Sequence, residues 1–176
     1  QTYLDGDVFD MTINSDGGSN WPRGPRDVVS LYPVNPERYA KTLVRDKAVS
    51  FSGSWSPHGP NGKPPSIRGT IVDYLKSRNV PIHQRQTPDP PYQEHADFLL
   101  SSQSTVNVAW TGSEVRRHVK GRVVEAGLAG CLLFETRGSD AHDWFEPGDD
   151  YLEYEHPSEI LDAVARPEFV YQARGM

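Results

Sequence analysis

Short apolar runs alternate with amphipathic stretches along most of this chain, a pattern typical of strands that alternate with helices. The apolar runs predict strands at residues 49–51, 80–83, 105–109, 131–134 and 151–154. The intervening stretches predict helices at residues 67–75, 92–100, 121–128 and 157–165, the first with Ser66 as its N-cap. A further strand is expected at residues 7–14. Strands that follow one another through helices favour a parallel sheet.

Such a pattern defines the fold class as α/β, a Rossmann-like, doubly wound and mostly parallel sheet with helices on both faces. Residues 1–45 lack the pattern and read as a lead-in or inter-lobe segment, whereas residues 46–176 form the predicted domain. We expect the strand at 49–51 and the strand at 131–134 to be parallel neighbours. Gly53 and Glu135 would then lie at the carboxyl edge of the sheet, where ligands bind in this fold.

The composition fits one domain and narrows the classes of partner. The 176 residues are 36% hydrophobic, and 18 Lys and Arg against 24 Asp and Glu give a net charge of −6. An acidic chain repels a phosphate backbone, so nucleic acid is not an expected partner. No apolar run is long enough to predict a membrane span. The single cysteine, Cys131, lies in an apolar run and reads as core, which favours a reducing, cytoplasmic location.

The first candidate binding residues follow the first regular strand. Gly53 and Ser54 end that strand, and Arg68 lies in the next predicted helix. A glycine lets a ligand approach the backbone, and the start of a helix favours phosphate. Neither a complete G-x-G-x-x-G nor a P-loop is present, so a turn glycine and an ordinary surface arginine remain open alternatives.

The second candidate is a cluster of cationic side chains in this otherwise acidic chain. Five of them fall between residues 116 and 122: Arg116, Arg117, His118, Lys120 and Arg122. They predict a local anion site. Lys120 and Arg122 would point about 160° apart inside a helix, so both reach one ligand only if the helix begins near Lys120. The alternative is a solvated helix in which Arg122 and Glu125 form a surface ion pair.

The same region resembles a known family. Residues 120–135, KGRVVEAGLAGCLLFE, followed by 144–154, WFEPGDDYLEY, resemble the C-terminal lobe of GT-B glycosyltransferases. The similarity is greatest to the spore-maturation-type (CgeB-like) family, with its Arg-x-x-Glu helix, small-residue turn, buried strand and Phe-x-x-Gly loop. Upstream, residues 49–54 with Arg68 and Leu75 resemble the family's strand, glycine and following helix. The resemblance spans roughly residues 48–164.

The resemblance implies that this lobe binds the donor, a nucleotide-diphosphate sugar. Glu125 matches the glutamate that accepts hydrogen bonds from the ribose hydroxyls. Arg68, Lys120 and Arg122 match diphosphate ligands, with Gly53 and Ser54 beside them. These cations and the helix terminus would stabilise the leaving diphosphate in place of a metal, so no metal or other cofactor is expected. The expected partner is an N-terminal lobe, in the same chain or another, without which the chain would bind a donor but transfer no sugar.

Arg117 is a departure from this pattern. Many retaining relatives carry a second glutamate eight positions before the first, where this chain has Arg117. Retention of configuration is therefore not supported, and no catalytic residue is assigned. The departure also keeps open a non-catalytic module that binds a nucleotide, a glycan or another protein. The sequence does not indicate the base, sugar or acceptor.

A metal site and a serine hydrolase are the two alternative kinds of site. The pair Glu94–His95 and the run 140–143 could ligate a metal, although the histidines lack ligand spacing. No Gly-x-Ser-x-Gly elbow is present to support a hydrolase. Trp55 and Trp110 lie at expected loop edges, where they would either stack on a ligand or pack against the domain.

Overall fold

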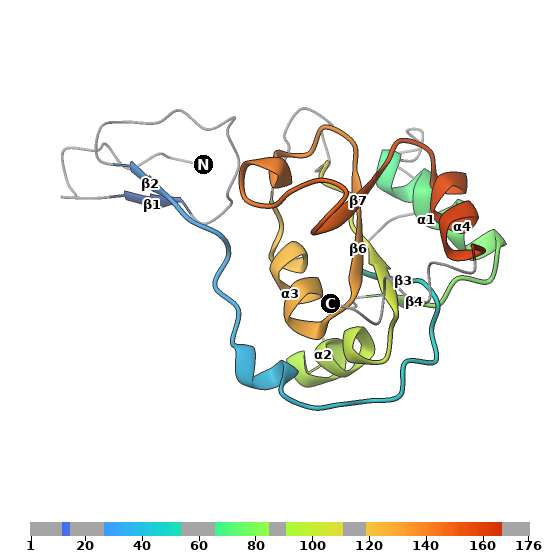
Figure 1. The fold of residues 1–176 in the computed structure, drawn as a ribbon, viewed down its shortest axis with the longest axis horizontal. Helices are drawn as coiled ribbons and strands as arrows, with labels where there is room; N and C mark the ends of the chain where they lie inside the picture. The colour runs from blue at the N-terminus through green and yellow to red at the C-terminus, as the bar shows by residue number, and fades with distance from the viewer. Residues whose placement is uncertain (1–11, 15–26, 54–65, 85–90, 111–118, 167–176) are drawn as a thin grey trace, which may run out of the picture.

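The domain is built on one parallel sheet. The computed structural model describes residues 12–14, 27–53, 66–84, 91–110 and 119–166. Its main sheet contains β3 (Ser50–Gly53), β4 (Ile82–Gln84), β5 (Ser104–Val106), β6 (Leu132–Thr136) and β7 (Tyr151–Tyr154). They pair in parallel in the order β4-β3-β5-β6-β7 (Figure 1). Two short strands, β1 (Thr12–Asn14) and β2 (Asp27–Val29), form a separate parallel pair.

The strand order creates a switch point beside β3. The chain passes from β3 outward to β4 and then returns to the other side of β3 to form β5. Phe51 pairs with Val106, which pairs with Phe134, so Gly53 and Glu135 lie at the same carboxyl edge as expected. The expectation that β3 and β6 are neighbours is wrong, because β5 lies between them. Alternating apolar runs identify strands but carry no information on their lateral order.

Among the described residues four helices cover the sheet, and local signals set their ends. They are α1 (Ile67–Ser77), α2 (Tyr92–Leu100), α3 (Gly121–Ala129) and α4 (Pro157–Val164). The Ser66 side chain caps α1 by accepting a hydrogen bond from the Gly69 amide. Lys120 is the N-cap of α3, which confirms the expected start of this helix. Gly130, with φ at 60°, ends α3 in the left-handed conformation and turns the chain directly into β6.

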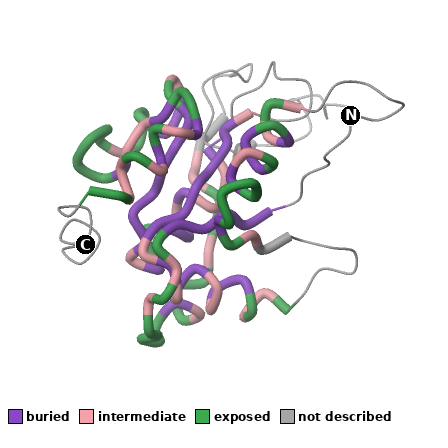
Figure 2. The backbone as a smooth tube through the Cα atoms, turned by 90° about the vertical axis from the view of Figure 1, so that its right-hand side faces the viewer, coloured by how far each residue is buried: buried purple, intermediate pink, exposed green. Residues whose placement is uncertain are grey.

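The helices bury the two faces of the sheet separately. Helices α1 and α4 pack on one face, against Phe51, Val106 and Phe134. Helices α2 and α3 pack on the other face, against Leu133 and Tyr151. Strands β3, β5 and β6 are buried along their whole length, and Figure 2 shows such buried strands at the centre of the domain. This is the three-layered, Rossmann-like α/β arrangement that the sequence pattern predicts.

The described part of the N-terminal segment packs against the domain. After β2 the chain runs alongside α3 to a 3-10 helix, η1 (Pro36–Tyr39), next to α2 (Figure 1). Leu31, Val34 and Tyr39 join the core cluster between α2, α3 and the sheet. The proposed domain boundary at residue 45 stays a prediction. No helix within the described ranges is long and apolar enough to cross a membrane.

Candidate functional site

Gly53 ends β3 at the switch point and admits a side chain from α3. Its φ is +149°, in the region that favours glycine. A Cβ atom added at Gly53 would lie 2.8 Å from Nη2 of Arg122. The Arg122 guanidinium therefore rests against the end of the strand, 5.8 Å from the centre of the Phe51 ring. The absence of a side chain at Gly53 is what allows this close approach.

Three cationic side chains from two helices converge on this edge. Arg122 Nη1 donates to Oδ1 of Asn107, just beyond β5, at 3.2 Å. Lys120 Nζ donates to the carbonyl oxygens of Val108 and Trp110, the latter at 3.1 Å. Arg68, in the first turn of α1, donates from Nη2 to the same Trp110 carbonyl at 3.1 Å. The two cationic regions found in the sequence thus form one site.

Lys120 is the most perturbed of these cations. Burial, together with the nearby charges of Arg68 and Arg122, lowers the pKa of Lys120 to about 6, although Glu135 opposes the shift. Burial also lowers the pKa of Arg68. A bound anion would lie close to all three groups, and its attraction to each of them would offset the repulsion among them. This electrostatic arrangement favours binding of a compact, multiply charged anion.

A buried carboxyl group backs the cations at the end of β6. The side chain of Glu135 is fully buried and accepts hydrogen bonds from Asn107 Nδ2 at 2.6 Å and from the Thr136 amide and hydroxyl at 2.8 and 2.9 Å. Burial raises the pKa of Glu135, although these hydrogen bonds and Lys120 oppose the shift. Asn107 connects Glu135 to Arg122, because its amide donates to the first and accepts from the second. Glu135 and Asn107 thus fix the position of the Arg122 guanidinium.

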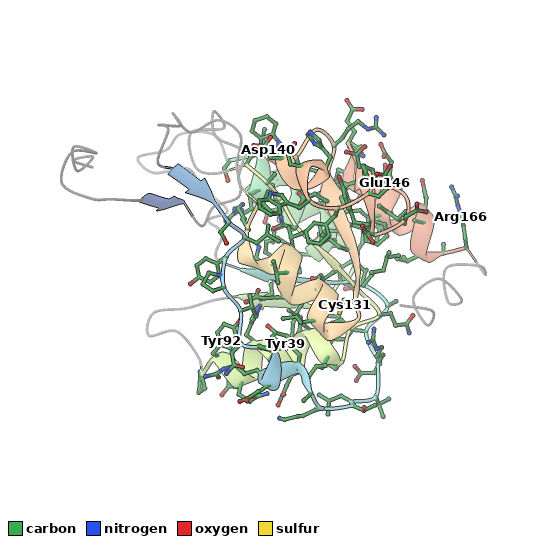
Figure 3. The ribbon with its side chains drawn as sticks, turned by 60° about the vertical axis from the view of Figure 1, so that its left-hand side comes forward. Tyr39, Tyr92, Cys131, Asp140, Glu146 and Arg166 are labelled. Atoms are coloured by element: carbon green, nitrogen blue, oxygen red, sulfur yellow. The ribbon has the colours of Figure 1, made fainter. Side chains whose placement is uncertain are left out.

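Glu125, one turn along α3 from Arg122, belongs to a second buried network. Its Oε1 accepts a short hydrogen bond from the Tyr92 hydroxyl, and its Oε2 lies 2.9 Å from Nε2 of His95. His95 Nδ1 lies 2.8 Å from the Ser52 hydroxyl, next to Gly53. The Tyr92 and Tyr39 hydroxyls are 3.3 Å apart, and Figure 3 shows the two side chains side by side.

This burial rules out the surface ion pair considered for Arg122 and Glu125. Only 7% of Glu125 is exposed, and its carboxylate oxygens contact Tyr92 and His95 of α2. Burial raises the pKa of Glu125, but the hydrogen bonds from His95 and Tyr92 outweigh this effect and hold the pKa below its usual value. Glu125 is therefore ionised at neutral pH.

Several sequence candidates fall outside this arrangement. Ser54, Trp55, Arg116, Arg117 and His118 lie outside the described residues. Trp110 packs against the core on the α1 face, as its packing alternative predicted. Cys131 is buried, as expected, and its thiol donates to the Leu99 carbonyl at 2.8 Å. Burial raises the pKa of this thiol to about 12, which makes it a poor nucleophile.

The residue pairs that could have ligated a metal do not form a metal site among the described residues. His95 is buried between Glu125 and Ser52, whereas the neighbouring Glu94 is exposed. His142 lies 3.4 Å from Asp143, with both side chains about half exposed. Within the part of the chain that the structure describes, no three His, Cys, Asp or Glu side chains gather as metal ligands would.

Sequence reasoning did not identify Asn107, Tyr92, His95 or Ser52 as part of the site. A signal was present in α2, where Tyr92, His95, Ala96 and Leu99 share the i, i+3, i+4, i+7 face. That face is buried, so its two polar residues need partners. Asn107 had no comparable signal, because its role depends on β5 lying between β3 and β6.

The fold and the site together define a class: a Rossmann-like lobe with a cationic site at the switch point of its sheet. Residues 58–169, well over half of the chain, match the family model described as glycosyl transferase-like. The chain belongs to this family of glycosyltransferase-like proteins, which is of the GT-B type.

A solved structure shows the same fold. The chain is similar to AviGT4, described as a glycosyltransferase involved in avilamycin A biosynthesis, with a TM-score of 0.53 and 18% sequence identity. The alignment covers 94% of this chain and 60% of the AviGT4 chain. The chain thus spans less than two thirds of that glycosyltransferase. No curated protein sequence matches it significantly.

Proposed function

We propose that this chain binds a nucleotide-diphosphate sugar and forms the donor lobe of a GT-B glycosyltransferase. The observation that carries the proposal is the convergence of Arg68, Lys120 and Arg122 at the carboxyl edge of the sheet, beside Gly53. Family membership and the AviGT4 fold support transfer of a sugar in general terms. Assignment to the spore-maturation-type subfamily remains a prediction, as does a cytoplasmic location.

The three cations and the start of α3 would hold the diphosphate. The first amides of a helix lack partners within the helix and carry a partial positive charge, so they attract phosphate. Lys120, at the N-cap, and Arg122, in the first turn, place their charges at this same end of α3. Negative charge grows on the diphosphate as the bond to the sugar breaks, and these groups would stabilise it in place of a metal.

Glu125 would accept hydrogen bonds from the ribose hydroxyls. An ionised carboxylate offers about four acceptor positions, of which Tyr92 and His95 fill two. Two positions therefore remain for a ligand. Glu125 lies one turn beyond Arg122 on α3, so the proposed ribose and diphosphate contacts come from the same helix.

Sugar transfer would require a second lobe. The acceptor must be held about 3–3.5 Å from the anomeric carbon in a site closed to water. In a two-lobed enzyme each lobe supplies one wall of that site, and the alignment with this chain covers 60% of the AviGT4 chain. An N-terminal lobe, in the same or another chain, is therefore the proposed partner.

The second candidate function is a binding module that has lost catalysis. It is favoured by Arg117, which stands where many retaining relatives carry a glutamate. Both functions include donor binding or a site derived from it, so turnover in the presence of the N-terminal lobe separates them.

Calorimetry with uridine, guanosine and adenosine diphosphates and their sugars tests donor binding. Arg122→Ala removes a charged hydrogen-bond donor and should weaken the tightest ligand by about 10- to 100-fold. Arg137→Ala is the matched control, because Arg137 is 55% exposed and pairs with Glu155. Glu125→Ala should cost about 1–3 kcal/mol of binding free energy. Absence of binding by the wild type, or equal affinities for the Arg122 and Arg137 variants, would overturn the proposal.

Turnover is measured as release of nucleoside diphosphate in the presence of mixed acceptors. The chain of residues 1–176 should show none that depends on acceptor. Sustained release that requires an acceptor would show that a complete active site is present and would remove the need for a second lobe.

A further inference from the structure

The two oxygens of the Glu125 carboxylate are each fixed by a different residue of α2. Tyr92 donates to Oε1, and His95 Nε2 lies 2.9 Å from Oε2. Helices α2 and α3 are in direct contact on one face of the sheet, so the side chains of Tyr92 and His95 on α2 reach Glu125 on α3. The carboxylate is therefore held at both ends and cannot rotate without breaking a buried hydrogen bond.

The anchoring residues are themselves fixed. His95 is 6% exposed, and its second ring nitrogen lies 2.8 Å from the Ser52 hydroxyl, which is fully buried in β3. The two ring nitrogens thus contact two different groups, Nε2 the Glu125 carboxylate and Nδ1 the Ser52 hydroxyl. Tyr92 is supported by the Tyr39 hydroxyl at 3.3 Å and by the Arg38 guanidinium, 4.9 Å from its ring centre.

From this geometry we infer that Tyr92 and His95 are positioning residues that orient Glu125 toward the ribose hydroxyls of the nucleotide. The inference rests on the proposed function, because it assigns the ligand of Glu125. It goes further in naming α2 as a determinant of ribose recognition, although neither residue touches the nucleotide. Pre-orienting the carboxylate removes the cost of ordering it when the ligand binds.

Removing the ribose hydroxyls from the ligand distinguishes a positioning role of Tyr92 from a purely structural one. The probes are uridine and guanosine diphosphates, each compared with its 2′,3′-dideoxy counterpart by calorimetry. The ribose preference is the ratio of the two dissociation constants. If Tyr92 only stabilised the fold, its loss would weaken both ligands of a pair equally. If it orients Glu125, its loss weakens only the ligand that carries the hydroxyls.

Tyr92→Phe is the sharpest variant, because it removes one hydroxyl and keeps the ring. It should reduce the ribose preference by about five- to tenfold, as loss of one hydrogen bond to a charged group predicts, while dideoxy affinity changes less than about twofold. Tyr74→Phe on α1 is the control and should leave the ratio unchanged. His95→Gln, which keeps an N–H donor, should retain more of the preference than His95→Ala.

A double-mutant cycle links the effect to Glu125. In a Glu125→Ala background, Tyr92→Phe should cause little further loss of ribose preference, because the group that Tyr92 orients is absent. An unchanged ratio in Tyr92→Phe, or an equal loss for both probes, would overturn the inference while leaving the diphosphate site in place. A wild-type chain that binds a diphosphate and its dideoxy counterpart equally would also overturn the inference, because Glu125 would then not bind the ribose hydroxyls. A wild-type chain that binds none of the uridine, guanosine and adenosine diphosphates would refute the proposed function itself.

Discussion

Lys120 should take up a proton when the diphosphate binds. Its pKa of about 6 in the free chain means that at pH 8 only about 1% of the molecules carry charge at this position. A bound diphosphate replaces the repulsion from Arg68 and Arg122 with attraction and favours the charged form. At pH 8, charging Lys120 costs about 3 kcal/mol, two pH units at 1.36 kcal/mol each. Affinity should therefore fall about tenfold per pH unit from pH 6.5 to 8.5.

Calorimetry in buffers of different ionisation enthalpy measures this uptake. The ligand should be a nucleotide sugar, because its phosphates do not titrate near neutrality. We expect uptake of close to one proton at pH 8 and about half a proton at pH 6. Lys120→Arg keeps a cation that does not lose its proton, so it should abolish most of the uptake and flatten the pH dependence. Affinity that stays constant from pH 6 to 8.5, without proton uptake, would refute the assignment of Lys120 to the phosphate.

Other predictions concern stability and reactivity. Gly53→Ala forces a β-carbon against Arg122 at a backbone angle suited to glycine, so nucleotide-diphosphate affinity should fall at least tenfold with the fold retained by circular dichroism. Ser66→Ala removes the hydrogen bond to the Gly69 amide and should lower the free energy of unfolding in urea by about 1 kcal/mol; a change below 0.3 would argue against the cap. Cys131 should resist a thiol reagent at pH 8 until the chain is unfolded, and rapid labelling of native protein would contradict its burial.

The sequence predicts most of the fold because each element has a local signal. The helix from Tyr92 to Leu100 follows a run of prolines, α3 ends at a glycine, and the apolar strands are short and separate. Lateral strand order has no such signal, since it is decided by which helix faces can be buried together. That is why β5 was not expected between β3 and β6.

The site was predictable only where its chemistry is local. The charge cluster and the Arg122–Glu125 spacing indicate α3, and Gly53 marks the end of a strand. Arg68 and Lys120 meet at the Trp110 carbonyl, which is 42 positions from Arg68 and 10 positions from Lys120. The same holds for His95 and Glu125, which are 30 positions apart. Such pairings come from packing rather than from spacing.

The carbonyl oxygens that accept from Lys120 and Arg68 have a kinetic consequence. In the free chain these cations already donate to the backbone at Val108 and Trp110. An arriving diphosphate therefore replaces the carbonyl acceptors of Lys120 Nζ and Arg68 Nη2 with its own oxygens. Its departure returns each donor to a partner that is already in place. Product release then costs less than from a site that must be left empty. We therefore expect a short residence time for the spent nucleotide, even though the positive charges of Arg68 and Arg122 favour its entry.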